Sequence, residues 1–444
     1  MSSIGLANHF TYKKLIRFVL PCVIMMVITS LYTIVDGFFV SNFVGKNAFA
    51  ALNLIWPFLM LLGGVSFMIG SGGSALIAYT LGEGNEDKAN RIFTMLVYVL
   101  VVTGIILSAI GFVFMRPIAK FLGASEHMID DCVLYGRILL CSNTFLILQN
   151  AYQSFLVTAE KPHLGLALSI IAGVTNMVLD FLLVYVYSWG IWGAALATAF
   201  SQFLGGIIPS IYFSRKNSSR LKFVKTSLDL KALASACGNG SSEMMTNLSS
   251  SIVSLLYNYQ LLALAAENGV AAYGAIMYIA FTFSALFFGY AIGSTPIFGF
   301  HCGAGNSDEL KSLLKKSLRL TLFVGIAMTT LSALLAPVMG QIFVGYDREL
   351  YEMTVHGLRI YAFTFLLSGF NIFTSAFFTG LNNGKVSALI SFLRTLVFQV
   401  ISIFALPAML GLTGVWLASV VAEGVTLIVS AVLIVVNRHK YHYL

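Results

Sequence analysis

The sequence consists mainly of long apolar stretches separated by short polar connections. Each stretch is long enough to cross about 30 Å of hydrocarbon as a helix, which takes roughly 20 residues. Short segments of alternating hydrophobicity, which membrane β-barrels require, are not found. The pattern therefore predicts an all-α polytopic membrane protein. The twelve expected transmembrane helices cover residues 15–40, 48–80, 88–115, 131–156, 163–187, 190–213, 232–264, 269–300, 311–338, 353–380, 385–408 and 411–437.

The two halves of the chain repeat at a constant offset of 221 residues. The turn Gly82-x-Gly84-Asn85-x-Asp87, after the second apolar stretch, matches Gly303-x-Gly305-Asn306-x-Asp308, after the eighth. At the same offset Gly136 pairs with Gly357, Asn150 with Asn371, Ser154 with Ser375, Thr158 with Thr379, Gly190 with Gly411 and Gly193 with Gly414.

The repeat predicts how the halves are arranged in the membrane. Each repeat contains six helices, an even number, so both halves insert the same way up. The pseudo-twofold axis should then lie along the membrane normal, as in transporters with parallel repeats. We expect an N-terminal six-helix lobe over residues 1–213, a cytoplasmic linker over 214–231 and a C-terminal six-helix lobe over 232–444. A substrate would bind between the lobes.

The charged residues indicate the orientation. Only 10% of the 444 residues are charged, the mean hydropathy is +0.88, and the net charge is +8. With a cytoplasmic N-terminus, 19 Lys and Arg residues fall in inside segments, and outside loops hold only Lys46, Arg116, Lys120 and Arg348. This asymmetry predicts that both termini are cytoplasmic. The positive net charge therefore reflects the topology of the chain in the membrane, and no nucleic-acid partner is expected.

Three other features of the chain limit its class. Lys13, Lys14 and Arg17 precede the first apolar stretch, which no small-residue cleavage site follows, so this stretch should be a retained helix. The five cysteines form no CxxC pair and predict neither a disulfide framework nor a metal knuckle. None of the motifs HExxH, GxSxG or GxxxxGK[ST] occurs. We therefore expect a protein that is not an enzyme and has no cofactor.

Acidic side chains occur inside the apolar stretches of the first half. A charged side chain near the bilayer centre costs roughly 2.5–3.5 kcal/mol on insertion scales. Asn176 and Asp180 are four residues apart, on one face of a helix. Counted at 1.5 Å per residue, Asp36, Asp180 and Thr198 lie within roughly 10 Å of one another in depth. Their oxygen atoms suit a hard cation.

This cluster belongs to the first half alone. The repeat partners of Asp36, Asn176, Asp180 and Thr198 are Tyr257, Val397, Ile401 and Ser419. A feature needed only by the scaffold would be expected in both halves. The residues therefore favour an ion or proton site, and the alternative is two carboxylates capped separately by backbone or hydroxyl donors.

Four further positions inside apolar stretches are notable. Pro21 lies fifteen residues before Asp36 and removes a helix hydrogen bond, so the first helix could exist in straight and bent forms. A static kink explains Pro21 equally well. In the second half, Arg394 and Glu423 lie at similar depth on neighbouring helices and are expected to neutralise each other. Glu243, without an evident cationic partner, could attract a cationic substrate, take a proton, or only pack.

The chain resembles the multidrug and toxic compound extrusion (MATE) family over nearly its whole length. The resemblance rests on twelve helices in two repeats, on the Gly-x-Gly-Asn-x-Asp turn and its copy, and on two motifs. These are Pro21…Tyr32…Asp36 and Asn176-xxx-Asp180, which are most similar to the DinF-type branch with its bacterial exporters. The chain departs from the NorM-type branch, which carries an acid in helix ten where Asn371 stands here. Glu243 resembles that branch's acid in helix seven.

The resemblance implies a function and a site. The function is a cation-coupled (H⁺ or Na⁺) antiporter that exports small, amphipathic, often cationic drugs across the bacterial cytoplasmic membrane, working as a monomer in the lipid bilayer. Asp36, Asn176, Asp180 and Thr198 would bind the coupling ion, as ligands of Na⁺ if sodium is used. Tyr32 and Asn150 would support them, and Glu243 and Asn371 would form a possible substrate or second-lobe site.

Other functions predict other patterns. A flippase for a lipid-linked oligosaccharide or another lipid-like substrate should carry more cationic residues in its central cavity than this chain places inside its apolar stretches. An enzyme embedded in the membrane would need a nucleophile with a base, or a metal constellation, inside the helices. A receptor or channel gives no reason for a repeat with acids in one half only.

Overall fold

The structure is a computed structural model that describes residues 4–44 and 46–443, and its regular secondary structure there is entirely helical. Within these residues the elements are α1 (Tyr12–Phe39), η1 (Val40–Val44), α2 (Lys46–Gly82), α3 (Glu86–Phe121), α4 (Ile129–Thr158), α5 (Pro162–Leu179), η2 (Asp180–Val186), α6 (Gly190–Ser214), α7 (Leu230–Gly303), α8 (Ser307–Val344), α9 (Arg348–Tyr361), α10 (Phe363–Gly380), α11 (Gly384–Phe392), η3 (Leu393–Val397), α12 (Phe398–Leu410) and α13 (Leu412–Tyr441), where η denotes a π-helix.

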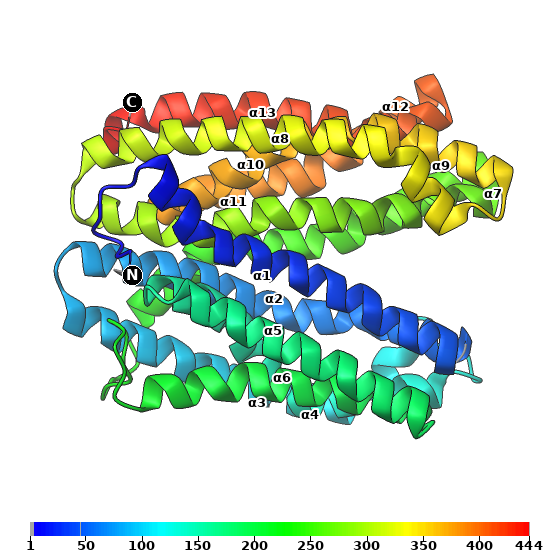
Figure 1. Ribbon diagram of the computed structural model, residues 1–444, viewed down its shortest axis with the longest axis horizontal. Helices are drawn as coiled ribbons and strands as arrows, with labels where there is room; N and C mark the ends of the chain where they lie inside the picture. Colours follow the sequence, from blue (N-terminus) through cyan, green and yellow to red (C-terminus); the bar gives the residue numbers. More distant parts are fainter. Residues whose placement is uncertain (1–3, 45, 444) are drawn as a thin grey trace.

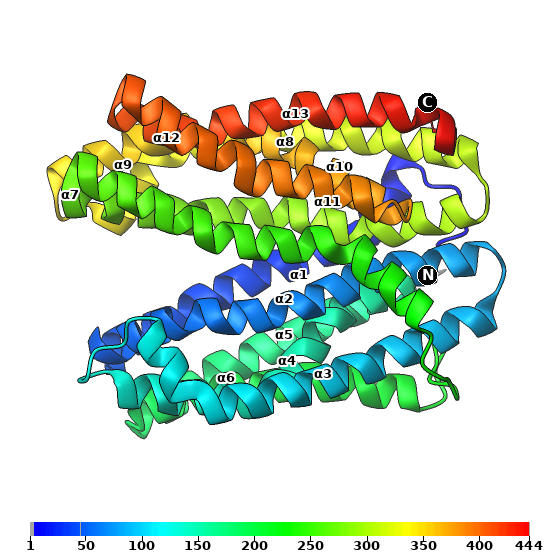
Figure 2. The ribbon, with the colours of Figure 1, turned by 180° about the vertical axis from the view of Figure 1, so that it is seen from behind.

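The longest helix, α7, contains two of the expected membrane spans. Ala265 and Ala266 have non-helical backbone angles, with φ of −142° and +48°, so residues 230–264 and 267–303 are two helices joined by a reversal. Figure 2 shows the chain turning back at that end of α7. Eleven helices of the described chain are long and apolar enough to cross a membrane, and α7 is one of them. Counting both parts of α7 gives twelve spans, which confirms the expected fold class.

Several spans are interrupted helices. The fifth span changes from α5 to the π-helix η2 at Asp180, and the eleventh passes from α11 through η3 to α12. The tenth is made of α9 and α10, which are separated at Ala362. By contrast, α1 is uninterrupted through Pro21. Irregular backbone inside a span is therefore found near several of the intramembrane polar residues.

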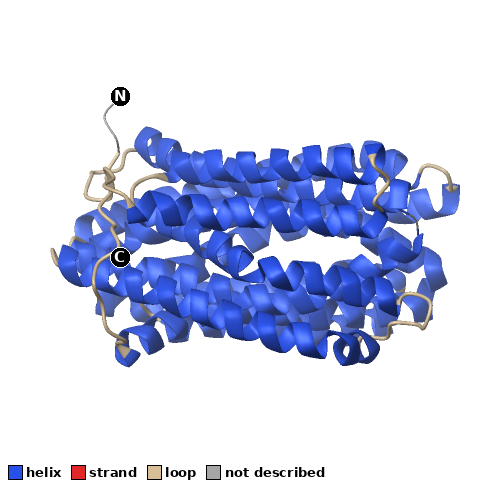
Figure 3. Ribbon diagram, turned by 90° about the horizontal axis from the view of Figure 1, so that it is seen from below, coloured by secondary structure: helices blue, strands red, loops and turns tan. Residues whose placement is uncertain are grey.

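The spans form two lobes that lie side by side (Figures 1 and 2). Seen from below, the described chain consists of long helices joined by short loops (Figure 3). One lobe contains α1 to α6 and the other α7 to α13. Both termini lie at the same end of the molecule, called here the terminal end, and the reversal of α7 lies at the opposite, distal end. The ribbons of the two lobes diverge towards the distal end (Figure 2). The molecule therefore has the shape of a V that is closed at the terminal end.

The repeated glycine turn forms helix caps at the terminal end. The side chains of Asn85 and Asn306 accept hydrogen bonds from the backbone N–H groups of Lys88 and Glu309, at 3.0 and 3.1 Å. The preceding Gly84 has a φ of +80°, which side chains rarely adopt, so the turn requires glycine. The repeated turn thus starts α3 and α8 and needs no functional explanation.

The connection between the lobes lies along the first lobe. Residues 215–229 are not helical, and they run beside α3. The backbone N–H groups of Lys222 and Val224 donate to the side chains of Asn90 (2.7 Å) and Thr94 (3.1 Å). At the end of the connection, the backbone N–H of Asp229 points to the sulfur of Met95 at 3.1 Å. The connection is therefore fixed to the first lobe up to the start of α7.

Glycines bring the two lobes into close contact in the half of the molecule nearer the termini. At Gly72 and Gly240, α2 and the first part of α7 pack so closely that an added Cβ would overlap a carbonyl oxygen, of Ala236 and of Met68 respectively. At Gly303, the second part of α7 packs equally closely against Tyr79 of α2. Close backbone approach through small residues is a common way for membrane helices to associate. The seal between the lobes is thus built from backbone contacts.

We predict that Gly240→Ala weakens this seal. The new Cβ would collide with the backbone of Met68, which cannot rotate away, and such overpacking costs roughly 1–3 kcal/mol. The measurement is thermal unfolding of the purified protein, with a lower midpoint expected. The matched control is Gly238→Ala, two residues away in α7, where a Cβ would meet nothing within 4 Å. Equal midpoints in the two variants would contradict the assignment.

Candidate cation-binding site

Asp180 is the most deeply buried acid of the first lobe. It has no solvent-exposed surface and stands where α5 passes into the π-helix η2. Neither carboxylate oxygen has a hydrogen-bond partner among the described residues. A buried polar atom without a partner costs roughly 1–3 kcal/mol, and more if it is charged. Since π-helical turns are frequent at functional sites, both the backbone and the side chain mark this position.

The other predicted ligands surround the same point. Asp36 of α1 lies with its carboxyl group beside the side chains of Asp180, Asn176 and Thr198. The Asn176 amide donates a long hydrogen bond of 3.5 Å to the Thr198 hydroxyl. The structure thus brings together four residues from α1, α5, η2 and α6 that the sequence placed at similar depth.

The cluster has an excess of oxygen acceptors. One oxygen of Asp36, the side-chain oxygen of Asn176 and both oxygens of Asp180 are buried without partners. None of the ion pairs between described residues includes Asp36 or Asp180. Two carboxylates, an amide oxygen and a hydroxyl are a suitable donor set for a hard monovalent cation. A proton on either carboxyl group would equally supply the missing donor.

Two tyrosines stand next to the acids. Tyr32 lies one turn before Asp36, and its ring packs against Gly173 of α5, where an added Cβ would come within 3.0 Å of the ring. Tyr135 of α4 is 1% exposed and lies within electrostatic range of both Asp36 and Asp180. The sequence analysis missed Tyr135. Its place depends on how α4 is rotated towards α1 and α5, which residue spacing along one helix does not reveal.

Asn150 points to a different neighbour. Its amide donates to the hydroxyl of Ser66 on α2 at 3.3 Å, and it is not among the side chains around the Asp36 carboxyl group. It therefore links α4 to α2.

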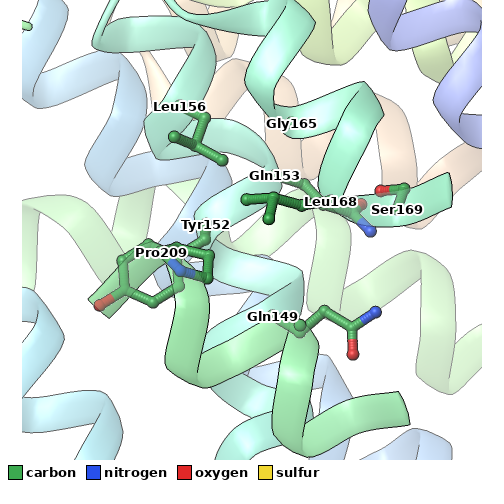
Figure 4. Close-up of a pocket in the computed structure, with 9 residues that line it drawn as sticks. Gln149, Tyr152, Gln153, Leu156, Gly165, Leu168, Ser169 and Pro209 are labelled. Atoms are coloured by element: carbon green, nitrogen blue, oxygen red, sulfur yellow. The ribbon is translucent and has the colours of Figure 1, made fainter. Parts of the chain in front are cut away.

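A small pocket lies in the first lobe between α4, α5 and α6 (Figure 4). Its volume of about 10 Å³ is near the minimum that holds one water molecule. Gln149, Gln153 and Ser169 supply its polar groups, and the Gln149 side-chain oxygen is buried without a partner. Ser169 precedes Asn176 by two helical turns, which places the pocket roughly 10 Å nearer the terminal end than the acids. The pocket is therefore separate from the acidic cluster, and its lining is mostly apolar.

In the second lobe, two of the intramembrane charges form an ion pair. Arg394 of η3 donates to Glu423 of α13 at 2.8 Å, which confirms the expected neutralisation. The other Glu423 oxygen accepts from the amide of Asn371 at 2.7 Å, and Ser430 donates to the Asn371 oxygen at 2.9 Å. Asn371 is therefore part of a satisfied network.

Glu243 differs from this network. Its side chain is half-buried in the first part of α7 and is in none of the ion pairs between described residues. Arg394, on a segment distant in sequence, acts on it electrostatically, but no ion pair joins the two side chains.

Twelve spans in two repeated lobes are the architecture of membrane transporters built from internal repeats. A family model described as MatE matches the chain twice, over residues 21–182 and 243–404. The chain therefore belongs to the MatE family, as the resemblance predicted, and each match falls within one lobe.

Known proteins of this family match along the whole chain. Multidrug export protein MepA of Staphylococcus haemolyticus is 23% identical, with 93% of this chain and 91% of that protein aligned. The protein of the same name from a Staphylococcus aureus strain is 21% identical, with coverage of 97% and 94%. Two solved MATE structures, one in a straight and one in a bent conformation, superpose with TM-scores of 0.94 and 0.89. They are 22% and 23% identical and cover 98–100% of both chains, which supports the fold.

We predict that the Arg394–Glu423 pair stabilises the second lobe only as a pair. Removing one partner, as in Arg394→Met, leaves a buried charge and should cost about 3–5 kcal/mol of unfolding free energy. The double variant Arg394→Met with Glu423→Met should recover much of this loss. The measurement is thermal unfolding of each variant. Arg348→Met, in the exposed pair Arg348–Glu352, is the control and should change little. Additive losses in the double variant would contradict the prediction.

Proposed function

We propose that the protein is a cation-coupled multidrug antiporter that exports amphipathic, often cationic compounds across a bacterial cytoplasmic membrane. The observation that carries the proposal is the cluster of the partly buried Asp36 and the fully buried Asp180, two carboxyl groups side by side without a basic partner among the described residues. The fold, the family and the relatives named multidrug export proteins support it.

The coupling ion acts through charge in the first lobe. Two carboxylates held close together in a low-dielectric site repel each other, and each loses its hydration. A Na⁺ ion held by Asp36, Asn176, Asp180 and Thr198 relieves the repulsion, and so does a proton shared between the acids. Tyr32 and Tyr135 limit the space around the site. The chemistry of the cluster accepts either ion, and the experiment below decides between them.

Transport requires that the ion bind one conformation better than the other, because equal affinity shifts no equilibrium. Asp36 is on α1, and its partners are on α5, η2 and α6, so binding depends on the position of α1 relative to the rest of the lobe. A change in the bend of α1 near Pro21 would alter that position. Inward flow of the ion supplies the energy, with about 2.3 kcal/mol per charge for each 100 mV of membrane potential.

The distribution of Lys and Arg supports a cytoplasmic location of the terminal end. Because the seal between the lobes is at that end, we infer an outward-facing state, and we propose that the protein works as a monomer in the bilayer. The substrate would bind between the lobes, where the half-buried carboxylate of Glu243 can attract a cationic compound. Asn371 contributes by holding Glu423, which leaves Arg394 neutralised beside Glu243.

The flippase alternative receives less support. A carrier of anionic lipid-linked sugars needs free cations in its central cavity. Arg394, the cation buried in the second lobe, is already paired with Glu423 at 2.8 Å. Asp180, by contrast, is fully buried within its span and has no ion-pair partner among the described residues, which favours cationic substrates.

We predict that Asp36→Asn and Asp180→Asn each abolish drug efflux while the protein is still made and inserted. Each change removes one of the charges that the coupling ion must neutralise. The measurement is efflux of a fluorescent cationic dye from cells, normalised to protein in the membrane. Asp130→Asn, at an exposed acid of α4, is the control and should keep full efflux. Unchanged efflux in both site variants would contradict the proposal.

We further predict that a gradient of Na⁺ or of H⁺ alone energises transport. Everted membrane vesicles should accumulate the dye when the coupling ion is concentrated inside them, since that side corresponds to the cell exterior. The wild type should respond to one of the two gradients when each is applied separately, and Asp180→Asn should respond to neither. Dye accumulation that ignores both gradients would exclude cation coupling.

A further inference from the structure

The segment before the first helix, residues 4–11, lies between the two lobes at the terminal end. Its apolar side chains Leu6 and Phe10 have no exposed surface. They belong to one hydrophobic cluster that includes Phe155 of the first lobe and Phe298 of the second. The ring of Phe10 packs edge-on against Phe18 of α1 and His301 of α7. Two side chains of this short segment are thus buried as deeply as core residues, whereas Ala7, His9 and Thr11 are exposed.

Polar contacts fix this segment to both lobes. On the first lobe, the backbone N–H of Leu6 donates to the Glu160 carboxylate at 2.7 Å. On the second lobe, the Phe10 N–H donates to one Glu309 oxygen at 2.8 Å, and the His9 ring bonds to the other. The Lys316 ammonium donates to the Phe10 carbonyl oxygen. Three contacts therefore join the segment to α8, although the chain continues directly into α1 of the other lobe.

Glu309 is suited to anchor the segment. Its side chain is 7% exposed, and both of its carboxylate oxygens are used by residues 9 and 10. The equivalent position in the first lobe, at the offset of 221 residues, is Lys88, which cannot accept such bonds. The anchor is therefore not a property of the repeated scaffold. It occurs only where the N-terminal segment reaches the second lobe.

We propose that residues 4–11 form a latch that holds the lobes together at the terminal end. This inference rests on the proposed function, because a transporter with alternating access must separate the lobes at that end. When they separate, the segment stays with α1, so its bonds to Glu309 and Lys316 break and Phe10 leaves its pocket beside His301. The latch thus favours the conformation with the terminal end closed, and its release is part of the change to the opposite state.

The test measures the distance between the lobes directly. Asp87 and Asp308 are exposed, repeat-related residues on the turns at the terminal end, one in each lobe. Spin labels at Asp87→Cys and Asp308→Cys, in a protein whose five natural cysteines are replaced, report this distance by double electron–electron resonance in nanodiscs. In variants without the latch we expect a second, longer distance between the two labels. The ratio of molecules with the long distance to molecules with the short distance should rise roughly tenfold, because a hydrogen bond to a charged group stabilises the closed state by about that factor.

Two variants and two matched controls make the test specific. Glu309→Gln removes the charge that accepts from residues 9 and 10, and Phe10→Ala removes the buried ring. The controls are Glu352→Gln and Phe121→Ala, which change the same residue types at exposed positions. Monodisperse protein with the short distance still present shows that a variant is folded. Unchanged distances in both Glu309→Gln and Phe10→Ala would overturn the latch.

The distance measurement can be interpreted separately from the efflux measurements, so failure of the latch and failure of the antiporter proposal can be told apart. The distances are measured without drug or ion gradient, so a latch can be found in a protein whose Asp36 and Asp180 variants keep full efflux. Conversely, loss of efflux in those variants with unchanged distances in Glu309→Gln would support the antiporter and reject the latch.

Discussion

The repulsion between two carboxyl groups in a medium of low dielectric constant is the constraint on which the first lobe depends. Asp36 and Asp180 lie together, and Asp180 is fully buried with both oxygens unpartnered. Such an arrangement is unfavourable unless a positive charge or a proton is supplied for part of the time. The surrounding helices hold it because α1, α5 and α6 are fixed by extensive apolar packing elsewhere. The rest of the lobe can therefore be understood as a scaffold that keeps an unfavourable pair in place.

The second lobe repeats the scaffold of the first but contains a neutralised pair of charges. Arg394 stands at the repeat position of Gly173, and Glu423 at that of Gln202. In the first lobe, Gly173 leaves room for the Tyr32 ring, and Gln202 accepts a hydrogen bond from Ser142 at 2.7 Å. In the second lobe, the arginine and the glutamate form a bond of 2.8 Å. The second lobe therefore has a cation, Arg394, at a position where the first lobe has glycine. This makes the two lobes electrostatically different.

The spacing of apolar residues predicted the twelve spans, the two lobes and the depth of the four cluster residues, because helix length and rise are nearly constant. It did not predict Tyr135, the electrostatic contact of Arg394 with Glu243, or the link from Asn150 to Ser66. These contacts depend on the rotation of each helix about its axis and on which distant helices become neighbours. The break at Ala265 and Ala266 matched the expected gap between spans seven and eight, although neither residue is a usual turn former. The burial of Leu6 and Phe10 was also missed. A short mixture of polar and apolar residues before the first span has no periodic pattern from which burial could be predicted.

The connection over residues 215–229 has a consequence for how the lobes can move. It is bonded to Asn90 and Thr94 along α3 and ends with Asp229 beside Met95, so almost none of its length is slack. Asp229 itself caps α7 by accepting from the N–H groups of Lys231 and Ala232. The covalent connection between the lobes can therefore bend only at the start of α7. Rotation of one lobe about that point is possible. A translation of one lobe away from the other would first have to break the hydrogen bonds between residues 215–229 and α3.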